Sequence, residues 1–105
     1  MPPDTNNDGR RAARVAMELP VTLRRKNGNP IISRTVDVGS GGMRVCCDRP
    51  LGIDELLTFE LDASGERVDG RARVLREHVA HTYALRFETL AAGGPEVLQR
   101  LTPPA

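Results

Sequence analysis

Aromatic residues are scarce in this chain of 105 residues, which has no tryptophan, one tyrosine and two phenylalanines. Proteins that bind single-stranded nucleic acid stack bases on exposed aromatic side chains, so this composition offers little for such a platform. An excess of positive charge is also missing, because the formal net charge is +1. We therefore expect no nonspecific attraction to a nucleic-acid polymer or to an anionic membrane.

Cysteines and long apolar runs are few as well. The two cysteines, Cys46 and Cys47, are adjacent, and neighbouring side chains of a strand point to opposite faces, so we expect two reduced thiols with one buried. No CxxC or CxxH pair is present, which argues against a metal site. No stretch approaches the roughly 18 apolar residues of a membrane span, and no signal peptide is recognisable. These absences predict a cytoplasmic protein without a metal or a membrane insertion.

The length of the chain suits one domain. Residues 1–9 contain no large apolar residue besides the initiator methionine and predict a flexible N-terminal segment. Residues 10–102 are expected to form the domain, and residues 103–105 a tail.

Apolar residues that alternate with polar ones predict six short strands. The first covers residues 15–23 and places Pro20 on its outward side, which indicates an edge or a bulge. Asn27-Gly28 then predicts a hairpin with a type I′ turn, which needs a positive φ at both central residues. The remaining strands are expected at residues 31–38, 43–47, 57–61, 68–76 and 83–87.

A short helix is expected at the C-terminal end. Pro95 suits a first helical position, and Val97, Leu98 and Leu101 give one apolar face. Six strands separated by turns in about 75 residues predict an all-β fold, a small six-stranded antiparallel β-barrel with one C-terminal helix. No nucleophile–base pair, P-loop or GxGxxG motif is present, so no enzyme is predicted.

A basic cluster precedes the first strand, where Arg10, Arg11 and Arg14 fall within five residues. The spacing RxxxR carries little weight alone, because fourteen arginines in 105 residues give about two such pairs by chance. A second pair, Arg67 and Arg71, is indeed present. The cluster is therefore either a solvated basic segment or part of a binding site.

The stretch VDVGSGGMRV, residues 36–45, combines an aspartate with three glycines. Asp37 has two interpretations, because an aspartate can shape a turn through its own backbone or can accept hydrogen bonds from a ligand. Arginine forks match phosphate oxygens and the O6/N7 edge of guanine, and a carboxylate accepts from the N–H groups of guanine. Glycines let a flat base approach the backbone, so this combination suits an anionic guanine nucleotide.

These two motifs, in this order, resemble those of the PilZ domain family, which carries RxxxR before the first strand and (D/N)xSxxG about two strands later. The resemblance covers residues 10–102 and implies a six-stranded barrel that binds cyclic di-GMP, a bacterial second messenger. By this match Arg10, Arg14, Asp37 and Gly42 are the implied ligand-binding residues. We add Arg11, which is adjacent and could share phosphate contacts, and Gly39 and Ser40 at the position of the motif serine. Gly39 stands where the family has serine, and Ser40, one residue later, is the nearest substitute.

The resemblance leads to a first hypothesis, a stand-alone cyclic di-GMP receptor and adaptor. Ligand binding would order its N-terminal arginine arm and signal to an effector protein that the sequence does not identify. The second is a degenerate barrel that binds no nucleotide, requires no cofactor and acts through protein contacts, with Gly39 as its support. The third is a barrel that binds RNA or single-stranded DNA, against which the balanced charge and the few aromatics argue.

Overall fold

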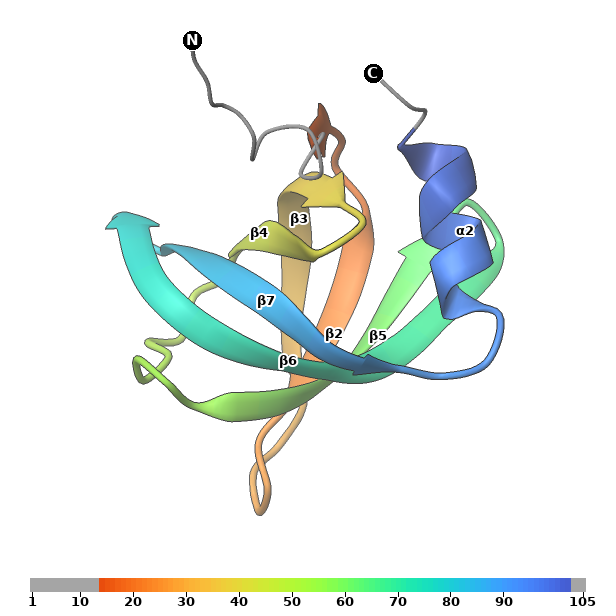
Figure 1. The fold of residues 1–105 in the computed structure, drawn as a ribbon. Coiled ribbons are helices and arrows are strands. Elements are labelled where there is room, and N and C mark those ends of the chain that lie inside the picture. The colour runs from red at the N-terminus through yellow and green to blue at the C-terminus, as the bar shows by residue number, and fades with distance from the viewer. Residues whose placement is uncertain (1–13, 103–105) are drawn as a thin grey trace, which may run out of the picture.

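The computed structural model describes residues 14–102, so the predicted N-terminal segment, Arg10, Arg11 and the tail lie outside the described residues. The elements are β1 (Arg14–Ala16), β2 (Pro20–Arg24), β3 (Ile31–Gly39), β4 (Gly42–Cys46), β5 (Leu56–Ala63), β6 (Glu66–Val79), β7 (Thr82–Leu90) and α2 (Gly94–Leu101). Six strands follow the order β3–β2–β5–β6–β7–β4, and β4 pairs again with β3 to close an antiparallel barrel (Figure 1). The predicted barrel and C-terminal helix are confirmed.

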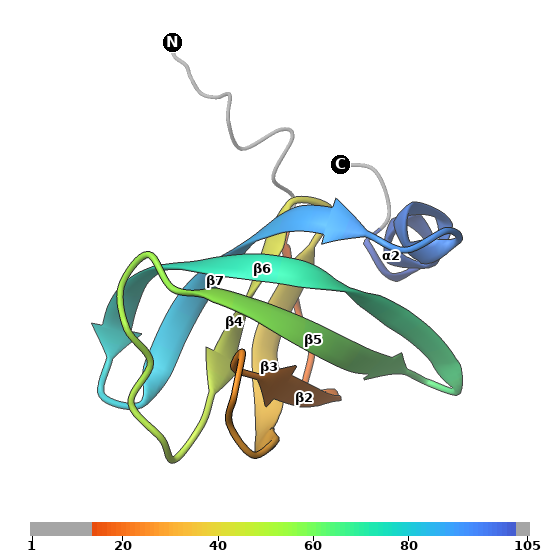
Figure 2. The ribbon, with the colours of Figure 1, turned by 90° about the horizontal axis from the view of Figure 1, so that it is seen from below.

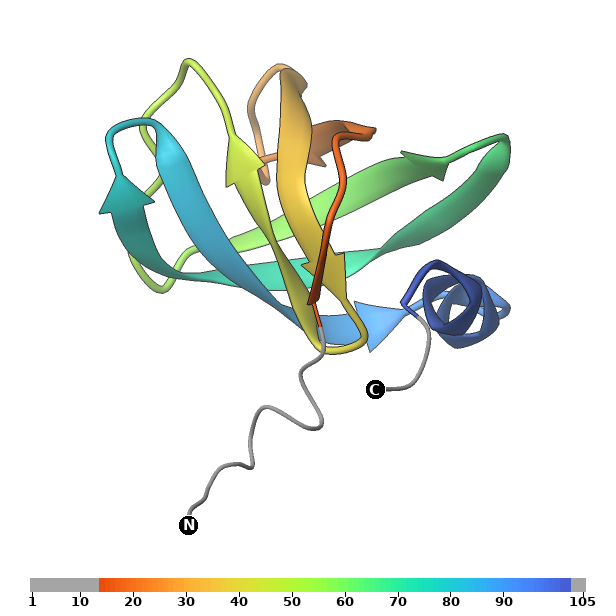
Figure 3. The same ribbon diagram turned by 90° about the horizontal axis from the view of Figure 1, so that it is seen from above.

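The predicted first strand is divided into β1 and β2, which pair with successive halves of β3 (Figure 3). Ala16 pairs with Asp37 and Pro20 pairs with Arg34, so the first strand contains one residue more than β3 over this interval. The Thr35 hydroxyl donates to the Met17 carbonyl at 2.6 Å and accepts from the Leu19 N–H at 2.8 Å. Thr35 thus satisfies backbone groups that the bulge removes from the ladder, which confirms a bulge beside Pro20.

The β2–β3 hairpin forms, but its predicted type I′ turn is wrong. Neither Asn27 nor Gly28 has a positive φ, and the Gly28 N–H instead donates to the Arg25 carbonyl within a six-residue connection. The two-residue connection between β5 and β6 has the expected geometry, with φ of 57° at Ser64 and 94° at Gly65. The longer loop relieves Asn27-Gly28 of the constraint that a two-residue hairpin imposes.

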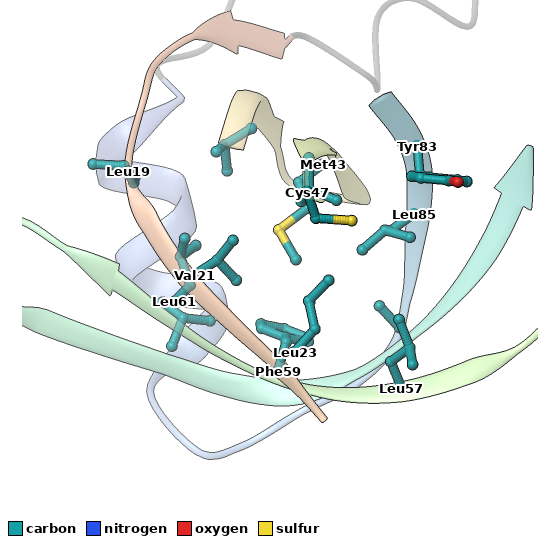
Figure 4. Packing of buried hydrophobic residues seen from close by; sticks show 14 of the residues in the cluster. Leu19, Val21, Leu23, Met43, Cys47, Leu57, Phe59, Leu61, Tyr83 and Leu85 are labelled. Atoms are coloured by element: carbon teal, nitrogen blue, oxygen red, sulfur yellow. The ribbon is translucent and has the colours of Figure 1, made fainter. Parts of the chain in front are cut away.

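The barrel interior is filled mainly by aliphatic side chains from all six barrel strands (Figure 4). Phe59 and Phe87 stack with their ring centroids 5.2 Å apart, and Tyr83 is buried. The scarce aromatics therefore serve the core and leave no stacking platform among the described residues. Cys47 is buried, Cys46 is exposed and both thiols are free, as predicted; burial raises the pKa of the Cys47 thiol.

Helix α2 packs against β6 and β3 through the buried Leu98. Gly94 lies against Val68 and Leu90, and Pro95 falls in the first turn of the helix. The β3–β4 turn and the β2–β3 loop lie at opposite ends of the barrel (Figure 1). This separation gives the molecule two distinct ends.

Candidate functional site

A bulge in β3 determines where Asp37 lies. Thr35 pairs with Val45 but Asp37 pairs with Arg44, so Val36 is an extra residue on β3. Without it, Asp37 would continue the buried series of Ile31, Ser33 and Thr35 into the barrel. The bulge instead turns Val38 into the core and places Asp37 in register with Arg44.

Asp37 is the centre of a network that we name the Asp37 cluster, made of Arg14, Asp37 and Arg44. Asp37 is only 5% exposed. Its Oδ2 accepts from Arg44 Nε at 2.7 Å and lies 2.5 Å from Arg44 Nη2. Its Oδ1 accepts from the Arg44 backbone N–H at 3.2 Å and from Arg14 Nη1 at 3.4 Å. A buried carboxylate needs such partners, because an unpaired charge there would be costly.

The two arginines of the cluster keep part of their surface in solvent. The Arg14 side chain is 36% exposed and the Arg44 side chain 31% exposed. Each guanidinium has five N–H donors, and the contacts with Asp37 use only some of them. The cluster therefore presents fixed donors to an anion while its buried carboxylate offsets one of the two positive charges.

Gly39 and Gly42 form a flat stretch of backbone beside the cluster, which we call the glycine floor. Arg14 pairs with Gly39 and Gly42 pairs with Arg86, so two side-chain-free residues lie between two arginines. A Cβ on Gly42 would lie 2.3 Å from the Leu85 carbonyl oxygen, whereas a Cβ on Gly41 would meet nothing within 4 Å. Gly42 is thus required where β4 approaches β7 closely, and the floor stays flat enough for a planar group.

Arg86 extends the positive side of the site, but a carboxylate partly offsets its charge. Arg86 Nη2 donates to Glu88 Oε2 at 3.0 Å, and Arg73 Nε donates to the same oxygen at 2.8 Å. The hydrogen bond from Arg73, followed by that from Arg86, lowers the pKa of Glu88 to about 2. Glu88 is therefore ionised at neutral pH and holds both arginines on the outer face of β6 and β7.

The structure brings together the described members of the predicted site. Arg14, Asp37, Gly39 and Gly42 lie on β1, β3 and β4, and the exposed Ser40 lies in the turn between β3 and β4. Their contacts with a ligand remain a prediction.

Arg44 was missed by the sequence analysis, although a signal for it exists. Strand pairing outward from the Ser40-Gly41 turn joins Val38 to Met43 and Asp37 to Arg44. A short turn recognised at residues 40–41 therefore predicts a cross-strand ion pair between Asp37 and Arg44.

Other site chemistries find no support in the described part of the chain. Residues 14–102 contain no group of three or more His, Cys, Asp or Glu side chains arranged to hold a metal ion. In the same range, no helix is long and apolar enough to cross a membrane.

Comparisons with known proteins agree on the family and the fold. The sequence profile of the PilZ domain matches residues 8–102. Among solved structures, the chain is similar to the inhibitor of motility MotI/DgrA of Bacillus subtilis, with a TM-score of 0.74, 18% identity, and coverage of 89% of this chain and 48% of that one. It therefore spans about half the length of that protein.

A second similar structure is the PilZ domain of CeSA from a cellulose-synthesizing bacterium. The TM-score is 0.65 at 18% identity, with 85% of this chain and 93% of that domain covered. At this identity the likeness establishes the barrel fold. A comparison with curated proteins gives no match.

Proposed function

The chain belongs to the PilZ domain family, a family of cyclic di-GMP receptor domains, and on that premise we propose that it is a cyclic di-GMP receptor in the bacterial cytoplasm. The observation that carries the proposal is the Asp37 cluster, which places Arg14 of the first motif against Asp37 of the second. Arg10 and Arg11 lie four and three residues before Arg14 in the sequence. The ligand would hold the segment that carries them against this end of the barrel and so create a surface for an effector protein.

The contacts of Asp37 suggest how a guanine enters the site. Three of its four contacts come from Arg44, and the fourth, from Arg14 Nη1 to Oδ1, is the longest at 3.4 Å. Arg14 would leave Oδ1 for a phosphate or the O6/N7 edge of guanine, and an N–H of the base would take its place. Arg44 would keep Asp37 oriented throughout and turn its remaining donors toward the phosphates.

A degenerate barrel that binds no nucleotide is the second candidate function. Gly39 lacks the hydroxyl of the family motif, and Asp37 already has four nitrogen atoms around its two oxygens. A missing hydrogen bond to a charged group costs about 1.5–3 kcal/mol, or roughly ten- to a hundredfold in affinity. The receptor hypothesis predicts weakened binding from Gly39, and the degenerate hypothesis predicts none.

Calorimetric titration of cyclic di-GMP into the purified protein separates these candidates. We expect micromolar or tighter binding, and a loss of about ten- to a hundredfold in the Arg14→Ala variant, because a charged hydrogen-bond donor is removed. Arg44→Ala is expected to lose at least about tenfold for the same reason.

Arg34→Ala is the matched control, because Arg34 lies on the same strand as Asp37 but forms an exposed pair with Glu18. It should bind like the wild type. Absence of both heat and a thermal shift at high ligand concentration would favour the degenerate barrel. An equal loss in Arg14→Ala and Arg34→Ala would contradict the site.

A further inference from the structure

A second basic site lies at the end of the barrel that carries the β2–β3 loop, opposite the Asp37 cluster. Figure 2 views the ribbon from this end. A cavity of about 620 Å³ opens there, a volume within the range of small-molecule sites. We name it the Thr58 pocket, and the described residues that line it are Arg24, Arg25, Lys26, Leu56, Leu57, Thr58 and Arg71. None of these residues is acidic.

The positive charges of the Thr58 pocket are mostly uncompensated. Within residues 14–102, the only cationic side chains without an ion pair or hydrogen bond are Lys26, Arg49, Arg71 and Arg76. Two of these four, Lys26 and Arg71, line this one pocket. A third lining residue, Arg24, has only a 3.7 Å contact with Glu60 between half-exposed side chains, a kind of pair that contributes little.

The strand register aligns two guanidinium groups and one hydroxyl across the pocket. Thr58 pairs with Arg24 of β2 on one side and with Arg71 of β6 on the other, so the three residues form one row across neighbouring strands. Neighbouring strands lie about 4.8 Å apart, which places the hydroxyl between the two arginines. All three side chains are exposed on the outer face, and Lys26 follows two residues after Arg24.

The chemistry of this row suits phosphate. Its charged groups only donate hydrogen bonds, and a phosphoryl group at neutral pH offers several acceptor oxygens to guanidinium forks and an ammonium. The Thr58 hydroxyl already donates to the Arg24 carbonyl at 3.4 Å. We propose that the Thr58 pocket binds a phosphate monoester, independently of the cyclic di-GMP site. The same chemistry is carried by a free phosphorylated small molecule and by a phosphorylated side chain of a partner protein.

Two-dimensional ¹⁵N–¹H NMR of the full chain, titrated with inorganic tripolyphosphate, tests the proposal. We expect saturable shifts at the amides of Lys26, Thr58 and Arg71. Arg71→Thr should weaken binding by about tenfold. Arg76→Thr removes the same charge from the same strand, from another unpaired arginine outside the pocket, and should change affinity by less than about twofold.

Equal losses in the two variants, or shifts confined to the Asp37 cluster, would overturn the proposal. Tight binding of a glutamate-rich peptide at the same amides would overturn phosphate as the ligand chemistry. Free O-phosphoserine and a phosphoserine peptide then distinguish the sources. Equal affinities support a small molecule, and a peptide that binds more than tenfold tighter supports a phosphorylated partner.

Discussion

The two ends of the barrel both hold arginines on the outer faces of neighbouring strands, but they differ in what stands between them. In the Asp37 cluster a buried carboxylate separates Arg14 from Arg44. In the Thr58 pocket a hydroxyl separates Arg24 from Arg71. The carboxylate fixes its arginines and offsets their charge, whereas the hydroxyl leaves charges that salt screens readily. Similar residues thus give an oriented site at one end and an open electrostatic site at the other.

The largest expected effect comes from adding a side chain at Gly42, beside the Asp37 cluster. Gly42→Ala would place a Cβ 2.3 Å from the Leu85 carbonyl oxygen, so β4 must shift relative to β7. We expect a loss of about 3 kcal/mol in the free energy of unfolding, measured by urea denaturation. Gly41→Ala, whose Cβ meets nothing within 4 Å, should stay within about 0.5 kcal/mol; a comparable loss there would refute the packing argument.

Asp37→Asn would replace the carboxylate of the Asp37 cluster by a neutral group, so its arginines would be left uncompensated like those of the Thr58 pocket. The variant loses the charge that Arg14 and Arg44 share, and we expect about 2 kcal/mol of destabilisation, below the cost of a fully buried pair because both arginines are partly exposed. Its two released guanidiniums should also bind tripolyphosphate in a strongly salt-dependent way. Wild-type stability together with an unchanged salt dependence would show that the ion pairs contribute little.

Glu55→Gln tests the same comparison at the Thr58 pocket, where we expect a smaller effect on stability. Arg25 donates to Glu55 at 2.7 Å and 3.2 Å, and this hydrogen bonding lowers the pKa of Glu55 below its ordinary value of 4.5. The variant removes the negative charge that offsets Arg25, whose Nη2 still donates to the Pro50 carbonyl. Tripolyphosphate affinity should therefore rise about two- to threefold by NMR titration, with less than about 1 kcal/mol lost in stability. Weaker binding in the variant would mean that Arg25 needs Glu55 to face the pocket.

The same pair gives a pH dependence with a defined sign. Because the pKa of Glu55 is lowered in the folded state, the pair stabilises the protein above the unfolded value of about 4.5. That contribution is lost as the pH falls through the lowered folded value. Glu55→Gln should therefore flatten the acid limb of the stability curve, and an unchanged limb would contradict the role of the pair.

The barrel was predictable from the sequence because alternation and turn residues are local signals. The same alternation did not reveal the bulges, since Met17, Leu19 and Val21 keep an apparent period of two across the break between β1 and β2. The type I′ turn predicted at Asn27-Gly28 was wrong because the turn type depends on the length of the whole connection.

The candidate site was only partly predictable for a related reason. Arg14 and Asp37 were expected to lie together from their motifs, and the structure places them in contact. Arg44 required the strand register counted outward from the Ser40-Gly41 turn, which pairs Asp37 with Arg44; the bulge at Val36 changes the register only beyond this pair. The Thr58 pocket required two strand pairings, of Thr58 with Arg24 and of Thr58 with Arg71, so Arg71 looked like half of a chance RxxxR match.

The most direct test of the account is an amide-resolved NMR titration of the full chain with cyclic di-GMP. We expect shifts at Gly39, Ser40 and Arg44, and little change at Thr58 and Arg71 on the far end of the barrel. Such a result would place the nucleotide at the Asp37 cluster. No shifts at saturating ligand, or shifts centred on Thr58 and Arg71, would contradict the assignment of the Asp37 cluster as the cyclic di-GMP site.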